Sequence, residues 1–230
     1  MEIMIFNVPA ETVGALSILD EFYYEVKNHP DKNINWTFVL SKPYLKGEKN
    51  IKVLRFPWIK KSWFHRLFFD HIVAPRLIKK YSIDKIISFQ NVIIPHTNIN
   101  QIVYVHNCLP FIDYKFKFKE NRLLWVYQNI VAINILKSVK KANKVIVQTN
   151  WMKSSCIKKT GVNNNKMEVV PPNLNIQVTK FFKPSKESFS TFFYPASEFI
   201  YKNHSVIVEA CKKLKDNNIN NYKVIFTLKG

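Results

Sequence analysis

Glycine is scarce in this sequence. The 230 residues contain four glycines, whereas an average usage of roughly 7% would give about sixteen. Dinucleotide-binding fingerprints and P-loops need several glycines within a few residues, because the chain must turn tightly and bring backbone N–H groups against phosphate. No window of the sequence supplies them, so neither kind of phosphate-binding loop is expected.

Cysteine is rare as well. The three cysteines are odd in number, widely spaced and without a Cys-x-x-Cys pair. They therefore predict neither a disulfide framework nor a zinc site, and they fit a reducing cytoplasm. The Asp-x-Asp, His-Glu-x-x-His and Gly-x-Ser-x-Gly motifs are also missing. We expect no metal site.

Long apolar runs are lacking too. The N-terminus carries Glu2 where a signal peptide needs positive charge, and its apolar run is short. A membrane span needs about eighteen apolar residues, and the nearest stretch, 123–136, is interrupted by polar residues. These features predict a soluble or peripheral protein.

Charge, by contrast, is abundant and mostly of one sign. Thirty-five Lys and Arg face 16 Asp and Glu, for a net charge of +19. Only four of the bases are Arg, and the high content of Lys, Asn and Ile is typical of an AT-rich gene. Residues 1–31 carry a net charge of −5, which leaves +24 on residues 32–230. We expect one basic surface and a polyanion or an anionic surface as its partner.

Short β-branched and aromatic runs alternate with longer segments of helical period, which predicts an α/β fold with a parallel sheet covered by helices. The expected strands are 2–8, 35–41, 51–55, 84–89, 101–105, 144–148 and 167–170, and the expected helices are 14–28, 62–80, 120–142 and 150–159.

A polar stretch, 173–188, predicts a linker after a Rossmann-like domain of residues 1–172. A strand, a helix and a strand are then expected within 189–230. A lone βαβ unit leaves strand edges unpaired, so we interpret it as the incomplete start of a second Rossmann-like domain. The alternative is a swapped or accessory unit that packs on the first domain.

Two segments at predicted strand ends are candidate binding loops, because ligands of doubly wound sheets bind at the carboxyl ends of strands. The segment 9–17 enters a helix and holds Gly14, where a phosphate or sugar can approach closely; an ordinary turn is the other interpretation. His106 directly follows the strand 101–105 and can hydrogen-bond a substrate hydroxyl. The alternative is a buried histidine satisfied by the backbone.

Basic and aromatic residues interleave from Arg55 to Phe69. Such a mixture suits a membrane surface, since rings lodge at headgroup depth while bases meet anionic lipid. It also suits single-stranded nucleic acid, which the shortage of Arg disfavours. A third interpretation is a helix whose aromatic rings face the core and whose lysines are merely solvated. The candidate membrane or acceptor surface comprises Arg55, Trp58, Lys60, Lys61, Trp63 and Arg66.

In combination and order, five segments resemble bacterial family 4 glycosyltransferases. They are PAETVGALSIL at 9–19, IVYVHNCLPF at 102–111, ANKVIVQTNWMK at 142–153, VVPPN at 169–173, and FYPAS followed by YKNHSVIVEA within 193–210. The resemblance implies the GT-B architecture, two Rossmann-like domains facing across a cleft. It further implies acceptor binding by the N-terminal domain and nucleotide-sugar binding by the C-terminal domain.

The resemblance also implies roles for particular residues. Gly14 and Ala15 match the loop beside the donor phosphates, His106 matches the histidine that contacts the donor sugar, and Lys202 matches the lysine that pairs with the donor diphosphate. The usual arginine companion of that lysine would fall near Ala196, so that half of the phosphate clamp is missing or replaced. The family's Glu-x7-Glu element has no counterpart here, and we expect little or no transferase activity from these 230 residues alone.

The resulting hypothesis is a retaining, metal-independent glycosyltransferase without a cofactor. Its expected partners are a nucleotide-diphosphate sugar donor, a lipid-linked saccharide acceptor and an anionic membrane, with no nucleic acid. The expected setting is the inner face of the cytoplasmic membrane, where a peripheral enzyme would build surface polysaccharide such as lipopolysaccharide O-antigen. The alternative is a donor-incompetent module that binds membrane or acceptor, or an inactive remnant; nucleotide titration discriminates between them.

Overall fold

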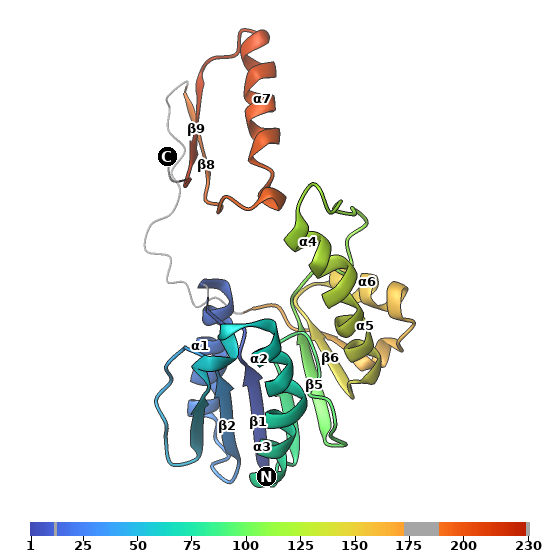
Figure 1. Ribbon diagram of the computed structural model, residues 1–230. Helices are drawn as coiled ribbons and strands as arrows, with labels where there is room; N and C mark the ends of the chain where they lie inside the picture. The colour runs from blue at the N-terminus through green and yellow to red at the C-terminus, as the bar shows by residue number, and fades with distance from the viewer. Residues whose placement is uncertain (12, 173–188, 229–230) are drawn as a thin grey trace. The chain divides into compact units, whose positions relative to one another are not determined.

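The computed structural model describes residues 1–11, 13–172 and 189–228 (Figure 1). The chain forms two compact units, Met1–Leu174 and Asn175–Gly230, and each is described by itself. The predicted linker, 173–188, lies outside the described residues.

The first unit is built on a seven-stranded sheet in which every neighbouring pair is parallel. Its strands are β1 (Glu2–Asn7), β2 (Asn35–Leu40), β3 (Ile51–Arg55), β4 (Lys85–Ser88), β5 (Asn100–Val105), β6 (Lys144–Val147) and β7 (Met167–Val169). The strand order is β3-β2-β1-β4-β5-β6-β7. The chain therefore runs outward from β1 to the β3 edge and returns to β4 on the other side of β1. The predicted α/β, Rossmann-like sheet is confirmed.

Helices cover both faces of this sheet. They are α1 (Val13–Asn28), η1 (Pro57–Lys61), α2 (Trp63–Phe68), η2 (Phe69–Val73), α3 (Ala74–Lys80), α4 (Arg122–Val126), η3 (Tyr127–Val131), α5 (Ala132–Lys141), α6 (Asn150–Thr160) and the short η4 (Asn164–Lys166). The hydroxyl of Thr149 accepts from the Met152 N–H and so caps the N-terminus of α6. Gly161, in the left-handed region at φ 69°, ends that helix.

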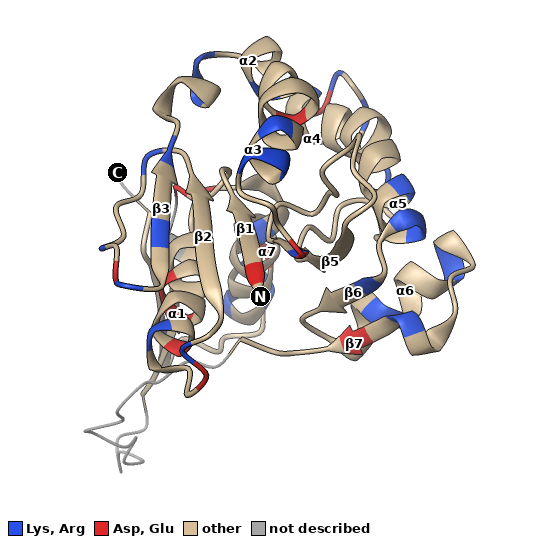
Figure 2. Cartoon of the chain, turned by 90° about the horizontal axis from the view of Figure 1, so that it is seen from below, with Lys and Arg blue, Asp and Glu red and all other residues tan. Residues whose placement is uncertain are grey.

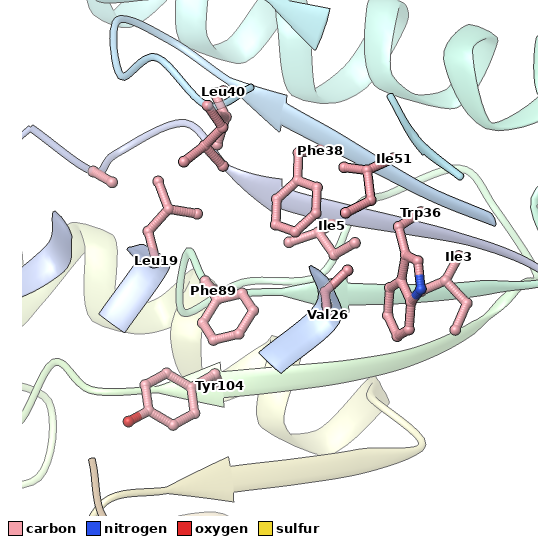
Figure 3. Close-up of a cluster of buried hydrophobic side chains, with 12 residues drawn as sticks. Ile3, Ile5, Leu19, Val26, Trp36, Phe38, Leu40, Ile51, Phe89 and Tyr104 are labelled. Atoms are coloured by element: carbon pink, nitrogen blue, oxygen red, sulfur yellow. The ribbon is translucent and has the colours of Figure 1, made fainter. Parts of the chain in front are cut away.

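The core lies on both faces of β1. Ile3 and Ile5 point to the face that α1 covers and pack with Phe38 and Leu19 (Figure 3). Met4 and Phe6 point the other way and belong to the cluster that includes Phe69 of η2 and Ile78 of α3. Because both faces are buried, β1 is apolar without alternation.

Two long helical segments each contain a π-helical turn. In η2 the N–H of Ala74 donates to the carbonyl of Phe69, five residues back, and Pro75, which has no N–H, follows directly. In η3 the N–H of Ala132 donates to the carbonyl of Tyr127. The predicted helices 62–80 and 120–142 are thus both interrupted. Such π turns are rare and often occur at functional sites.

Many of the lysines lie at the carboxyl ends of helices. Figure 2 shows Lys and Arg on α3, α5 and α6, and the last turns of these helices hold pairs of lysines. A positive charge there is favourable because the unpaired carbonyls at a helix C-terminus carry partial negative charge. Part of the excess of basic residues therefore stabilises the C-terminal ends of helices.

The second unit has the predicted βαβ form. Its strands β8 (Ser190–Tyr194) and β9 (Tyr222–Phe226) pair in parallel, and η5 (Ile200–Lys202) and α7 (His204–Asp216) connect them. Among its described residues, Ala196 alone is buried, whereas Phe192 and Phe193 are 58% and 61% exposed. The described part of this unit therefore has almost no core of its own.

Candidate functional site

A groove of about 400 Å³ lies at the carboxyl ends of β1, β4 and β5. One wall comes from α2 and η2 and the other from η3 and α5, while Pro9, Gln90 and Asn107 come from the segments that follow the three strands. The strand order reverses between β1 and β4, and ligands of open α/β sheets bind at such a reversal. We call it the switch groove. It is lined by Pro9, Ile59, Lys60, Ser62, Trp63, Arg66, Leu67, Asp70, Gln90, Asn91, Val92, Asn107, Tyr127, Val131, Asn134 and Ile135.

A larger hollow, of about 600 Å³, lies along the β3 edge. Its lining includes Glu2 and Asn35, the first residues of β1 and β2. Ligands of α/β sheets bind at the opposite, carboxyl ends of the strands. The switch groove is therefore the stronger candidate despite its smaller volume.

Two polar side chains of the switch groove, one half-buried and one buried, have buried atoms without a partner. Arg66 Nε donates to Asp70 Oδ2 at 2.6 Å, but Asp70 Oδ1 has no partner. Gln90 is only 4% exposed, and neither its Oε1 nor its Nε2 has a partner. Burial raises the pKa of the Asp70 carboxyl, although the Arg66 guanidinium and, to a smaller extent, the nearby Gln90 amide oppose this. The Gln90 amide is thus close to Asp70 but makes no well-aligned hydrogen bond with it. An unpaired buried polar group costs about 1–3 kcal/mol, so a ligand that supplies partners would recover this cost.

Asn91 joins the segments that follow β4 and β5. Its backbone is in the left-handed region at φ 65°, and its Oδ1 accepts from the N–H groups of His106 at 2.8 Å and Asn107 at 2.9 Å. The His106 ring then lies with Nε2 3.3 Å from Asn91 Nδ2, while its Nδ1 is buried without a partner. No backbone group hydrogen-bonds to this ring nitrogen. The alternative of a histidine satisfied by the backbone therefore does not hold for it. Burial lowers the pKa of His106, which favours the neutral ring.

The pH dependence of stability should report this burial. Because the pKa of His106 is lower in the folded chain, its stabilising contribution is complete above the unfolded value of about 6.5. It is lost as pH falls through the folded value. We expect His106→Asn to flatten the decline in unfolding free energy between about pH 7 and pH 5, as measured by urea titration. An equally steep decline in the variant would contradict this assignment.

Gly14 and Ala15 lie in the first turn of α1. Gly14 is exposed, and a β-carbon built on it would meet no atom within 4 Å. Ala15 is half-buried and packs against the core cluster beneath the helix. Gly14 is thus helical rather than part of a turn, and packing does not require glycine there. The open space above the first turn is compatible with the predicted contact with a ligand.

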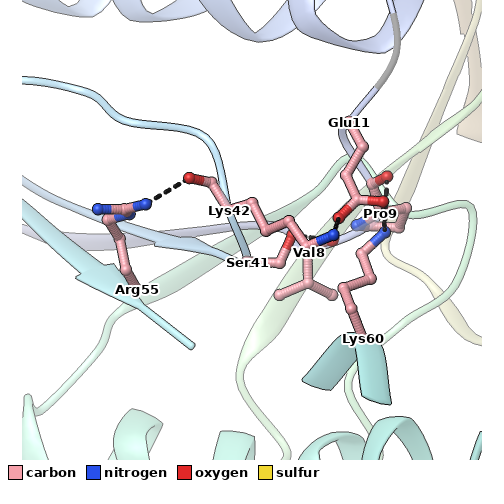
Figure 4. A network of polar contacts seen from close by, with 7 residues as sticks. All are labelled: Val8, Pro9, Glu11, Ser41, Lys42, Arg55 and Lys60. Carbon is pink, nitrogen blue, oxygen red and sulfur yellow. Dashed lines mark hydrogen bonds and ion pairs between the residues drawn. The ribbon is translucent and has the colours of Figure 1, made fainter. Parts of the chain in front are cut away.

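Two of the predicted surface bases instead hold loops together (Figure 4). Lys60 Nζ lies 3.3 Å from Glu11 Oε2 and donates to the Pro9 carbonyl at 3.1 Å. Arg55 Nη2 donates to the Lys42 carbonyl, and Lys42 pairs with Glu11 in turn. Slight burial acts to raise the pKa of the Glu11 carboxyl, but the two lysines lower it overall. This network fixes the segments that follow β1, β2 and β3.

Of the other residues of the predicted surface, two are partly buried and two are exposed. Trp58 is half-buried with its ring 6.0 Å from that of Phe69, and Arg66 is paired with Asp70. Lys61 and Trp63 are exposed. The exposed large apolar side chains of α2, which we call the α2 face, are Trp63, Phe64, Leu67 and Phe68, with exposed fractions of 60%, 83%, 49% and 53%.

Lys202 belongs to the second unit and lies at the end of η5, before α7 begins. Its carbonyl accepts from the Tyr194 hydroxyl at 2.7 Å, and its Nζ lies 5.6 Å from the centre of the Tyr201 ring. Asn203, left-handed at φ 51°, turns the chain into the helix. A cation beside a helix N-terminus can bind an anionic group together with the free N–H groups. Ala196, near the expected place of a second cation, is buried.

Sequence reasoning missed Asp70, Gln90 and Asn91. Gln90 and Asn91 directly follow the predicted strand 84–89, so the strand-end rule that selected His106 applies to them equally. Asp70 lies four residues after Arg66, the spacing of a helical ion pair. That spacing alone predicts an ion pair between Arg66 and Asp70, although the basic and aromatic residues around it dominate the sequence pattern.

Solved structures of known proteins share this fold. WaaG, a glycosyltransferase involved in lipopolysaccharide biosynthesis, aligns with 100% of this chain and 64% of its own, with a TM-score of 0.62 and 11% identity. The lipopolysaccharide outer core galactosyltransferase WaaB in its apo form aligns with 100% of this chain and 68% of its own, with a TM-score of 0.58 and 14% identity. The chain has the GT-B-type fold.

A ugt transferase from Siraitia grosvenorii in complex with UDP also aligns with 100% of the chain and 63% of its own, with a TM-score of 0.56 and 12% identity. UDP-N-acetylglucosamine 2-epimerases match as well. No protein-family model and no curated protein matches the chain. At these identities the likeness establishes the fold alone.

Two further observations concern the described residues. In residues 1–11, 13–172 and 189–228, no group of three or more His, Cys, Asp or Glu side chains could hold a metal ion. None of the helices there combines the length and the apolar character needed to cross a membrane.

Proposed function

We propose that this chain contributes to a glycosyltransferase of the family 4 type, which transfers a hexose from a nucleotide-diphosphate donor to a lipid-linked saccharide; from these 230 residues alone we expect little or no turnover. The supporting observation is the alignment of the whole chain with two lipopolysaccharide glycosyltransferases, with the switch groove at the strand reversal. We assign it a retaining, metal-independent reaction in surface polysaccharide synthesis, such as that of O-antigen, at the inner face of the cytoplasmic membrane.

The proposed donor contacts are consistent with the local structure. His106 is half-buried and favours its neutral form, which can exchange a hydrogen bond with a sugar hydroxyl without placing a charge there. Gly14 leaves free space above the first turn of α1, where the N–H groups of a helix N-terminus favour phosphate. Lys202 would supply a point charge for the diphosphate.

The proposed acceptor is lipid-linked because the α2 face exposes three aromatic side chains and one leucine on one six-residue helix. Aromatic rings of this kind lodge at the headgroup level of a bilayer, and Lys61 lies beside them to meet anionic lipid. The membrane contact assigned to the basic and aromatic segment is thus centred on apolar side chains.

Titration with UDP and GDP tests the donor role. We expect saturable binding of one of them by the 230-residue chain, and a dissociation constant raised about 10- to 100-fold in Lys202→Ala, because a hydrogen bond to a charged group contributes about 1.5–3 kcal/mol. Lys212→Ala is the matched control, since Lys212 is an exposed lysine on α7 of the same unit. Isothermal titration calorimetry measures both.

Each other outcome has a distinct meaning. Equal weakening by both lysine variants would show a general charge effect and remove the role of Lys202. No saturable binding of either nucleotide would contradict the transferase proposal and favour the donor-incompetent module. Conversion of UDP-N-acetylglucosamine without any acceptor would favour epimerase chemistry instead.

A further inference from the structure

We propose that the switch groove binds a neutral sugar ring through Asp70 and Gln90, and that these two residues determine which acceptor the protein uses. The identification of that sugar as part of an acceptor rests on the proposed function. The binding itself follows from the unpaired polar atoms, the walls and the opening of the groove.

The unpaired atoms match the chemistry of sugar hydroxyls. Asp70 Oδ1 and Gln90 Oε1 are acceptors, and Gln90 Nε2 is a donor. Each hydroxyl of a sugar donates one hydrogen bond and accepts others, so neighbouring hydroxyls can satisfy all three atoms.

Charge at this place disfavours ionic ligands. Asp70 Oδ2 is already paired with Arg66 at 2.6 Å, so the pair is close to neutral overall. Lys60, the other charged residue of the lining, is already paired with Glu11. The free oxygen of Asp70 would repel a phosphate or carboxylate, and no further carboxylate lines the groove to hold a cation. A neutral, polyhydroxylated ligand is therefore the class that fits.

The walls suit the apolar faces of a sugar ring. Trp63 and Leu67 on one side and Tyr127 and Val131 on the other line the groove. Its volume of about 400 Å³ falls within the range of roughly 300–1,000 Å³ that is common for small-molecule sites. Asp70 lies in the π turn η2, and both Tyr127 and Val131 lie in the π turn η3. Irregular turns in both walls are typical of a functional site.

The groove opens onto the α2 face. Trp63 and Leu67 line the groove and also belong to that face, where they are 60% and 49% exposed. A molecule with its sugar at Asp70 and Gln90 can therefore lay an attached alkyl chain along α2. The ligand class is an amphiphile with a saccharide head.

Octyl glucoside, below its micelle concentration, is the probe for this site, and an octyl ether of tetraethylene glycol is the control with the same alkyl chain. We expect saturation-transfer NMR to show tighter binding of the glucoside by the unaltered protein. Gln90→Leu and Asp70→Asn should each weaken glucoside binding about tenfold and leave ether binding unchanged. Equal glucoside binding by all three proteins would overturn the proposal.

Thermal unfolding separates binding from folding. Gln90→Leu removes two unpaired buried polar atoms, so its unfolding midpoint should be unchanged or raised. Gln128→Leu is the matched control: Gln128 is also buried, but it accepts from Phe116 N–H at 2.9 Å and donates to the Tyr114 carbonyl at 2.8 Å. Its midpoint should fall. If Gln90→Leu also fell, Gln90 would be a structural residue and the proposal would be wrong.

Failure of the groove and failure of the proposed function give different results. UDP or GDP binding should be the same in Gln90→Leu and in the unaltered protein, because the assigned donor contacts use other residues. Loss of glucoside binding with nucleotide binding retained therefore supports the proposal. Glucoside binding by a protein that binds no nucleotide would keep the sugar site and contradict the transferase assignment.

Discussion

Replacing Phe69 with alanine should lower the free energy of unfolding by about 3–5 kcal/mol. Phe69 is fully buried in the cluster that contains Phe6 and Ile78, and its ring centre lies 5.3 Å from that of Phe56 and 6.5 Å from that of Phe6. The variant would leave a cavity where η2 meets the sheet. Urea titration measures the loss through the shift in the unfolding midpoint.

Phe64→Ala is the matched control. It removes the same side chain from the same helical segment, but Phe64 is 83% exposed. We expect a change within about 0.5 kcal/mol, since exposed positions contribute little to stability. Similar losses in the two variants would contradict the division of this segment into an inner and an outer face.

That division marks the limit of what the sequence could predict here. Between Arg55 and Phe69 the sequence favoured two opposed interpretations, rings in the core or rings at a membrane, and the structure contains both. Phe68 is 53% exposed and its neighbour Phe69 is fully buried. The π turn that begins at Phe69 changes the helical phase, so a periodicity of 3.6 residues does not carry through the segment. Pro75 is the one local signal of this change, and η3 has no proline.

The strands were predictable for a simple reason. A strand buried on both faces, such as β1, must be apolar at every position, and that pattern is local in the sequence. The strand order is not local, because it depends on which pairs come together across long connections. The partners of the charged residues are not local either: Lys60 pairs with Glu11, far from it along the chain.

The same distinction between local and non-local features explains why the sequence predicts only some residues of the candidate site. His106 was found because it directly follows a strand, and Gln90 follows one too. That Gln90 is buried with both polar atoms unpaired depends on helices that cover it, and no sequence motif records this. The feature that favours a ligand at the switch groove is therefore structural, whereas the family resemblance concerns the donor contacts.

The α2 face yields the other prediction with a large effect. The double variant Trp63→Ser with Phe64→Ser should weaken binding to anionic phosphatidylglycerol vesicles by at least about a hundredfold, because burying one large apolar side chain contributes about 1.5–3 kcal/mol. Co-sedimentation measures the loss. Tyr24→Ser is the matched control, since Tyr24 is a 60% exposed aromatic residue on α1. Equal losses in both, or none in the double variant, would contradict the assigned surface.

Charge should contribute less to vesicle binding than these rings do. A base near an anionic membrane contributes about 1 kcal/mol, so Lys61→Glu should weaken binding roughly tenfold and lessen its dependence on salt. Lys60→Glu is a poor test, because it would place two carboxylates together at Glu11 and disturb the segments after β1 and β2. A larger effect of Lys61→Glu than of the double aromatic variant would show that electrostatic attraction, rather than ring insertion, holds the protein on the membrane.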